Sequence, residues 1–189
     1  MLFRSVSFQP FFAAPSARTI ARMSLKHYYD LANLAQFNLA VTNTLIVAPI
    51  VATVTMFLAT LISWNAVRGQ FKGGAIPDFL TFINLAVPTV VFGLAMVFVY
   101  LSFPILHPIY GTIWILVIAF TTRYLTYTTR LMGGAVIQIH KELEEASQMS
   151  GSSRVQTFGR ITLPLLMPSF FNGWMWVTIH SLREATLAV

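Results

Sequence analysis

A short polar segment in the second half of the chain carries the residue types best suited to recognising another protein. Glu145-Ala146-Ser147 is followed by Gly151 and, after nine more residues, by Ile161-Thr162-Leu163-Pro164. A carboxylate such as that of Glu145 accepts strong hydrogen bonds from a basic residue of a partner, and the small residues that follow it allow a second backbone to approach closely. The chemistry expected of this segment is therefore recognition.

The segment 139–150 has the pattern of a short amphipathic helix. Its apolar positions recur at three- and four-residue spacing, and charged residues occupy the other faces. Gly151 is expected to end this helix, because glycine adopts the left-handed conformation that helix C-termini often require. The residues that share the apolar face are Leu143, Ala146 and Met149 or Ser150.

A second short helix is predicted directly after the glycine. Ser152 or Ser153 can cap its N-terminus, and it is expected to run towards Phe158 and to end at Gly159. Leu163-Pro164 then begins an apolar helix, since proline is tolerated in a first turn. The two short helices form a knob that could enter a groove of a partner or lie on lipid headgroups as an interfacial linker. These residues by themselves favour the two interpretations equally.

The composition indicates an integral membrane protein. Of the 189 residues, 56% are hydrophobic and 10% are charged, whereas about a quarter of the residues of a soluble domain are charged. No charged residue occurs in 31–67 or in 79–122. The chain has no cysteine, which excludes disulfides and thiolate sites. Its net charge of +6 fits contact with anionic lipid better than binding to nucleic acid.

The predicted fold is all-α, a polytopic transmembrane helical bundle. A bilayer core of roughly 30 Å needs about 20 apolar residues in a helix, and four stretches are long enough. The first contains Pro49, which is expected to kink it. Residues 185–189 begin another apolar run that is too short to cross, so a truncated fifth span is expected. The four spans are predicted at residues 39–64, 79–103, 110–131 and 163–182.

Basic residues assign the loops to the two sides of the membrane, since Lys and Arg favour the cytoplasmic side. The loop 65–78 and the segment 132–160 both carry such residues, whereas the connection 104–108 carries none. The first two are therefore expected inside and the third outside. This topology makes residues 132–162 a cytoplasmic segment.

The spacing of the polar segment resembles the EAA signature of permease subunits in binding-protein-dependent ABC importers. That pattern is Glu-Ala-Ala, three residues, Gly, nine residues, Ile, one residue and Leu-Pro. Ser147 stands here where the pattern has its second alanine, and serine is nearly as small. The resemblance extends from about residue 37 to residue 189. The positions that match are Glu145, Ala146, Gly151, Ile161, Leu163 and Pro164.

The resemblance implies a permease domain at residues 39–189 that works with other proteins. Cytoplasmic ABC ATPase subunits would drive transport, and a periplasmic or extracellular binding protein would deliver the substrate. A second permease domain, in the same parent chain or in another copy, would complete the pathway across a bacterial inner membrane. The matching positions and Ser147 would seat the segment 132–162 in a cleft of the ATPase. The chain has no phosphate-cradling glycine loop, so neither enzymatic activity nor a cofactor is expected of it.

Two further features bear on the substrate and the pathway. Ser181-Leu182-Arg183-Glu184 and Arg123-Tyr124-Leu125 resemble, less specifically, the ferric-iron branch of these permeases. Arg123 lies about two turns from the cytoplasmic end of its predicted span, where it could line a pathway or reach headgroups or an inner carboxylate. The other candidates for a pathway or gate, which can equally be interfacial anchors, are His180, Arg183 and Glu184.

The two ends of the chain fit a permease less simply. Residues 1–38 place Arg4, Arg18, Arg22 and Lys26 on the predicted outer side. An outer loop of a longer parent chain, an incorrectly assigned start or a targeting segment would each explain them. The incomplete last span motivates an alternative function, namely a non-transporting membrane scaffold or a degenerate permease remnant.

Overall fold

The computed structural model describes residues 8, 24–69, 73–74 and 76–184. All regular structure in these residues is helical, as the all-α prediction requires. The chain divides into two compact units, Met1–Thr44 and Leu45–Val189. The first unit holds α3 (Lys26–Ala32) and the start of α4 (Ala35–Arg68). Arg4, Arg18 and Arg22, on which the prediction for this end partly depends, lie outside the described residues.

The helix α4 contains the first predicted span and extends beyond it at both ends. Pro49 lies inside the helix and does not end it. Among the described helices, α4 alone is long and apolar enough to cross a bilayer without help from another helix. Its length of 34 residues exceeds the roughly 20 that a bilayer core requires.

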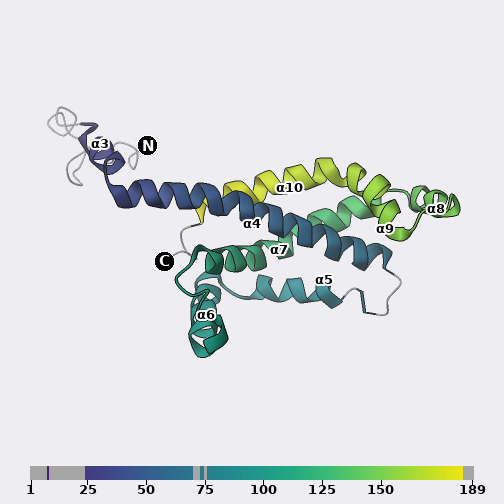
Figure 1. The fold of residues 1–189 in the computed structure, drawn as a ribbon, viewed down its shortest axis with the longest axis horizontal. Coiled ribbons are helices and arrows are strands. Elements are labelled where there is room, and N and C mark those ends of the chain that lie inside the picture. The colour runs from purple at the N-terminus through teal and green to yellow at the C-terminus, as the bar shows by residue number, and fades with distance from the viewer. Residues whose placement is uncertain (1–7, 9–23, 70–72, 75, 185–189) are drawn as a thin grey trace. The chain divides into compact units, whose positions relative to one another are not determined.

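The second predicted span is wrong as a single helix. Residues 76–102 instead form α5 (Ile76–Thr81), the 3₁₀ helix η1 (Phe82–Ala86) and α6 (Thr89–Ser102), and the two parts are bent by 112°. The break falls at Val87-Pro88, where Val87 is extended with φ −100° and ψ 121°. Proline lacks an N–H and disfavours helical geometry in the residue before it. Figure 1 shows α6 turned away from the line of α5.

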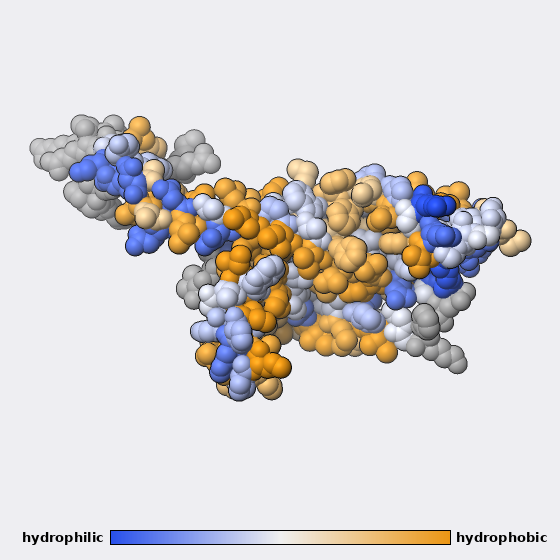
Figure 2. Space-filling model, viewed as in Figure 1, coloured by the Kyte–Doolittle hydropathy of each residue, from blue (hydrophilic) through white to orange (hydrophobic). Residues whose placement is uncertain are grey.

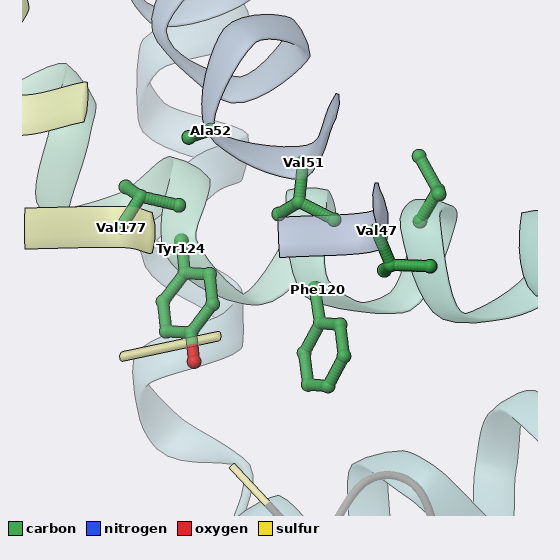
Figure 3. Close-up of a cluster of buried hydrophobic side chains, with 7 residues drawn as sticks. Val47, Val51, Ala52, Phe120, Tyr124 and Val177 are labelled. Atoms are coloured by element: carbon green, nitrogen blue, oxygen red, sulfur yellow. The ribbon is translucent and has the colours of Figure 1, made fainter. Parts of the chain in front are cut away.

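The core of the second unit lies between α4, α7 (Ile113–Gln138) and α10 (Leu163–Arg183). Figure 3 shows one of its two clusters, in which Val51 of α4, Phe120 of α7 and Val177 of α10 come together. Gly173 of α10 lets the helices approach closely, because an added Cβ there would lie 2.7 Å from the sulfur of Met56. Small residues at helix crossings are typical of bundles within membranes.

The elements α5 and α7 are joined by polar contacts. Arg130 of α7 forms an ion pair with Asp78 of α5, and its guanidinium also lies 4.3 Å from the ring centre of Phe82. Thr126 of α7 donates a hydrogen bond to the carbonyl of Thr81. These contacts hold α5 against α7. The chain therefore enters the break at Val87-Pro88 from a helix that is packed in place.

The ends of α4 and α7 meet at the part of the second unit that carries α8 (Lys141–Met149) and α9 (Arg154–Thr157) (Figure 1). Arg68, the last residue of α4, donates hydrogen bonds to the carbonyls of Val136 and Ile139 at 3.2 and 2.5 Å. The two basic loops predicted to share a side of the membrane therefore do begin beside one another.

The number of spans remains a prediction. The bent pair α5–η1 and α6 passes the same length and hydropathy test as α4 only when its two parts are counted together. The third predicted span corresponds to α7, which continues past it to Gln138, and the fourth corresponds to α10 within one residue. The predicted fifth span lies outside the described residues.

Candidate functional site

The helix α8 ends just before Gly151, as the sequence predicts. Gly151 has a φ of +88°. Its N–H donates to the carbonyl of Gln148 at 2.9 Å, and the N–H of Ser152 donates to the carbonyl of Ser147 at 3.2 Å. This pair of bonds is the Schellman arrangement, which satisfies carbonyls left over at a helix C-terminus.

The start of α9 is also local in origin. The hydroxyl of Ser153 accepts a hydrogen bond from the N–H of Gln156, and the N–H of Ser153 donates to the side-chain oxygen of Gln156. This capping box confirms Ser153 as one of the two predicted caps. We call the unit that α8 and α9 form, residues 141–157, the α8–α9 knob.

Gly159 does not end the second helix, so that prediction is wrong. It lies inside η3 (Phe158–Thr162), a π-helical turn that joins α9 to α10 without a break. Glycine permits a left-handed residue but does not require one. The ring of Phe158 packs 4.6 Å from that of Trp64, centre to centre, and Thr162 is fully buried. These tertiary contacts hold the chain in helical form through the glycine.

The buried face of α8 is polar. Glu144 is only 6% exposed, whereas Leu143 and Met149 of the apolar face are 46% and 89% exposed. The Glu144 carboxylate accepts a hydrogen bond from the Thr162 hydroxyl at 2.9 Å and lies 3.6 Å from Nε of Arg68. No pattern in the sequence marks Glu144, Thr162 and Arg68 as a set, and only the opposite charges of Glu144 and Arg68 could have suggested a pair.

The motif residues divide between the surface and the base of the knob. Glu145 is exposed and pairs with Lys141 one turn earlier, at 3.1 Å. The Ser147 hydroxyl lies 3.0 Å from that of Thr157, which joins α8 to α9. Ile161 lies in η3, and Leu163-Pro164 forms the first turn of α10. The exposed motif positions are Glu145, Ala146, Gly151 and Pro164.

Arg123 hydrogen-bonds to the segment around the helix break. Because α7 continues to Gln138, Arg123 lies about four turns from the end of its helix rather than two. Its guanidinium donates to the carbonyls of Asn84 and Val87 at 2.8 and 3.2 Å and to the hydroxyl of Thr89 at 3.0 Å. A break in a helix leaves backbone carbonyls short of donors. Arg123 supplies donors to two of them here, of which the Asn84 carbonyl also accepts the N–H of Val87 at 3.4 Å.

The structure groups two of the four pathway candidates. Arg123 and Glu184 both line a pocket of about 390 Å³ between the helix break, α7 and α10. His180 stacks on Trp176 of its own helix, with ring centres 3.9 Å apart, and Arg183 is exposed at the end of α10. Neither is among the residues that line the pocket.

Comparison with known proteins gives a consistent result. Residues 62–189 match the family described as binding-protein-dependent transport system inner membrane component. A putative ferric transport system permease protein, FbpB 1 of Haemophilus influenzae, is 35% identical over 147 residues, which cover 78% of this chain and 23% of that protein. The putrescine transport system permease protein PotI of Escherichia coli is 29% identical over 174 residues, 89% of this chain and 61% of PotI.

A third relative carries a different substrate in its name. The sulfate transport system permease protein CysT of Salmonella typhimurium is 25% identical over 177 residues, 87% of this chain and 62% of CysT. The chain thus spans less than two thirds of the length of each of these relatives. The family match covers most of the chain, including the α8–α9 knob. The chain belongs to the family of inner membrane components of binding-protein-dependent transport systems.

Proposed function

We propose that the chain is a transmembrane permease subunit, or part of one, of an ATP-driven importer, and that it couples to a separate ATPase through the α8–α9 knob. The observation that carries the proposal is the exposure of three apolar side chains on a knob that its own hydrogen bonds hold in shape. These side chains, exposed to 46%, 89% and 79%, are Leu143, Met149 and Val155.

The knob is preorganised for binding. The Schellman bonds end α8, the capping box begins α9, and Ser147 joins the two helices through Thr157. A surface that is already ordered loses little conformational freedom when it binds. The knob can therefore enter a cleft with its present shape.

The chemistry of the knob surface favours a protein partner over lipid. Figure 2 shows hydrophilic residues gathered over α8 and α9, in contrast to the hydrophobic surface over the part of α4 in the same unit. Lys141, Glu142 and Glu145 are exposed on the same helix as Leu143 and Met149. A surface that mixes exposed apolar and charged side chains is typical of a protein interface.

The proposed partners follow from the role of a permease subunit in an ATP-driven importer. Cytoplasmic ATPase subunits would bind the knob, a periplasmic or extracellular binding protein would deliver substrate, and a second permease domain would complete the pathway. The chain would cross a bacterial inner membrane several times, with ATP hydrolysis in the partner. Membership of the family of inner membrane components of binding-protein-dependent transport systems supports this assignment.

We propose ferric iron as the substrate and the pocket beside the helix break as part of its route. The ferric transport relative supports the substrate, although other relatives are named for putrescine and sulfate. Arg123 and Glu184 both line this pocket. Uptake of radioactive iron by membrane vesicles that contain the complete importer tests the substrate, with putrescine and sulfate as competing solutes.

Crosslinking at the end of α8 tests the coupling proposal. The chain has no natural cysteine, so Ser150→Cys introduces a single reactive group at an exposed position. We expect a bifunctional thiol–amine reagent to join this variant to an ATPase subunit in membranes. The matched control is Ser102→Cys, at the exposed end of α6 and away from the knob, which should give no adduct. Equal labelling of both variants, or no ATPase adduct at all, would favour a scaffold or remnant.

A further inference from the structure

A buried ion pair joins α8 to the helices behind it. Nε of Arg68 lies 3.6 Å from Oε2 of Glu144, and the two side chains are 13% and 8% exposed. Arg68 is the last residue of α4 and also donates to the carbonyls of Val136 and Ile139 at the end of α7. Glu144 accepts a hydrogen bond from Thr162, directly before α10. One pair of side chains therefore contacts α4, α7, α8 and η3.

This pair differs from the other ion pair of α8. Lys141 and Glu145 lie one turn apart in the same helix with side chains 69% and 57% exposed, so their contact is local. Burying charges is unfavourable, and apolar residues of similar size often hold a fold equally well. A buried pair that reaches from one helix to another instead fixes which groups meet, because each charge requires its own partner.

The two charged groups of this pair also lie too far apart to share a hydrogen bond. Nε of Arg68 is buried and finds no hydrogen-bond acceptor among the residues that the structure describes. A buried donor without an acceptor calls for an explanation. The 3.6 Å separation exceeds the hydrogen-bonding range, and a movement of roughly 0.5 Å would bring the two atoms within it. The contact can therefore tighten when α8 shifts against α4.

We propose that Arg68 and Glu144 are a positioning pair that makes the orientation of the α8–α9 knob depend on the ends of α4, α7 and α10. A movement of the knob is passed to those helices through this pair. The inference rests on the proposed function, because a bound ATPase would supply the movement. It assigns the two residues a role that the motif itself does not include.

Distance measurements within the chain test the link directly. Spin labels at Val54→Cys in α4 and Ser150→Cys at the end of α8 occupy exposed positions in an otherwise cysteine-free chain. The full chain, assembled with its partner subunits in lipid nanodiscs, should give a narrow distance distribution. Glu144→Gln should broaden it. Glu142→Gln, which changes an exposed carboxylate of the same helix, should leave it unchanged.

A second variant separates loss of the contact from misfolding of the chain. Arg68→Gln combined with Glu144→Gln leaves no unpaired buried charge, so this chain should fold even where Glu144→Gln alone does not. Its distance distribution should also be broad, because the directional contact is lost. A distribution as narrow as that of the unmodified chain would overturn the proposal.

Transport measurements separate a positioning role from a merely structural one. With the same subunits reconstituted into lipid vesicles, we expect Glu144→Gln to lower the solute taken up per ATP hydrolysed by about tenfold, with the ATPase still bound. Equal losses of uptake and hydrolysis, or loss of the bound ATPase, would overturn the proposal. If the unmodified chain binds no ATPase, the proposed function fails, and the spin-label comparison, made on the full chain alone in lipid nanodiscs, still decides whether the pair positions the knob.

Discussion

Two arginines in different regions of the second unit both donate hydrogen bonds to backbone carbonyls, but they differ in their other partners. Arg68 donates to the last carbonyls of α7 beside the knob, and Arg123 donates to two carbonyls at the Val87-Pro88 break. Arg68 also faces a buried carboxylate, that of Glu144. The hydrogen bonds of Arg123 within the described residues all go to neutral oxygens.

Each region requires something different of its arginine. At the break, hydrogen-bond donors are needed to satisfy backbone groups where water is scarce, and a guanidinium supplies several in fixed geometry. Beside the knob, the same side chain also connects one element to another through a charge. At the break the arginine satisfies backbone carbonyls, whereas beside the knob the arginine also links helices through an ion pair.

Arg68→Met should have the largest effect on stability. It leaves the Glu144 carboxylate buried beside an apolar side chain, and breaking a buried pair in this way destabilises by about 3–5 kcal/mol. Unfolding of the purified chain in mixed micelles with increasing denaturing detergent measures the loss. Lys141→Met, which breaks the exposed pair of α8, should change stability by less than about 0.5 kcal/mol. Equal effects of the two variants would remove the distinction between buried and exposed pairs.

Arg123→Met should have the next largest effect. The carbonyls of Asn84 and Val87 lose a charged donor, which costs about 1.5–3 kcal/mol, while the Asn84 carbonyl keeps the N–H of Val87. The same detergent titration measures the change. Arg123→Lys keeps the charge but not the planar fork, so it should recover only part of the loss. Full recovery by lysine would mean that charge, and not hydrogen-bond geometry, is what the break requires.

Ser147→Ala should have a small effect. It restores the residue that the motif favours but leaves the buried Thr157 hydroxyl without the Ser147 contact, a loss of about 1 kcal/mol. Hydrogen exchange over residues 141–157 measures how far the knob loosens. Ser150→Ala is the control, since among the described residues the Ser150 hydroxyl donates to the carbonyl of Ala146 of the same helix, and exchange should be unchanged. Identical exchange in both variants would show that Ser147 does not join α8 to α9.

Features with a local cause were predictable from the sequence. The turn at Gly151 and the cap at Ser153 each depend on a few neighbouring residues. The break at Val87-Pro88 was missed because hydropathy does not register a bend in a continuously apolar stretch. Proline alone did not indicate it, since Pro49 lies within an unbroken helix.

Features with a distant cause were not predictable. The inward direction of Glu144 depends on Arg68 and Thr162, which lie far from it in the sequence or on another element. The helical form at Gly159 depends on packing between Phe158 and Trp64. The role of Arg123 depends on a break that the hydropathy pattern concealed. In each case the deciding contact joins segments that local periodicity treats separately.

The turn at Gly151 has a consequence that concerns handedness. Its φ of +88° suits a residue of D configuration, and no described atom lies within 4 Å of where an L side chain would begin. The requirement for glycine there is therefore one of backbone conformation and not of space. A D-alanine placed at this position by chemical synthesis would keep the turn that L-alanine strains. It would also present a methyl group beside the proposed partner, so that the shape of the chain and the shape of its contact could be varied independently.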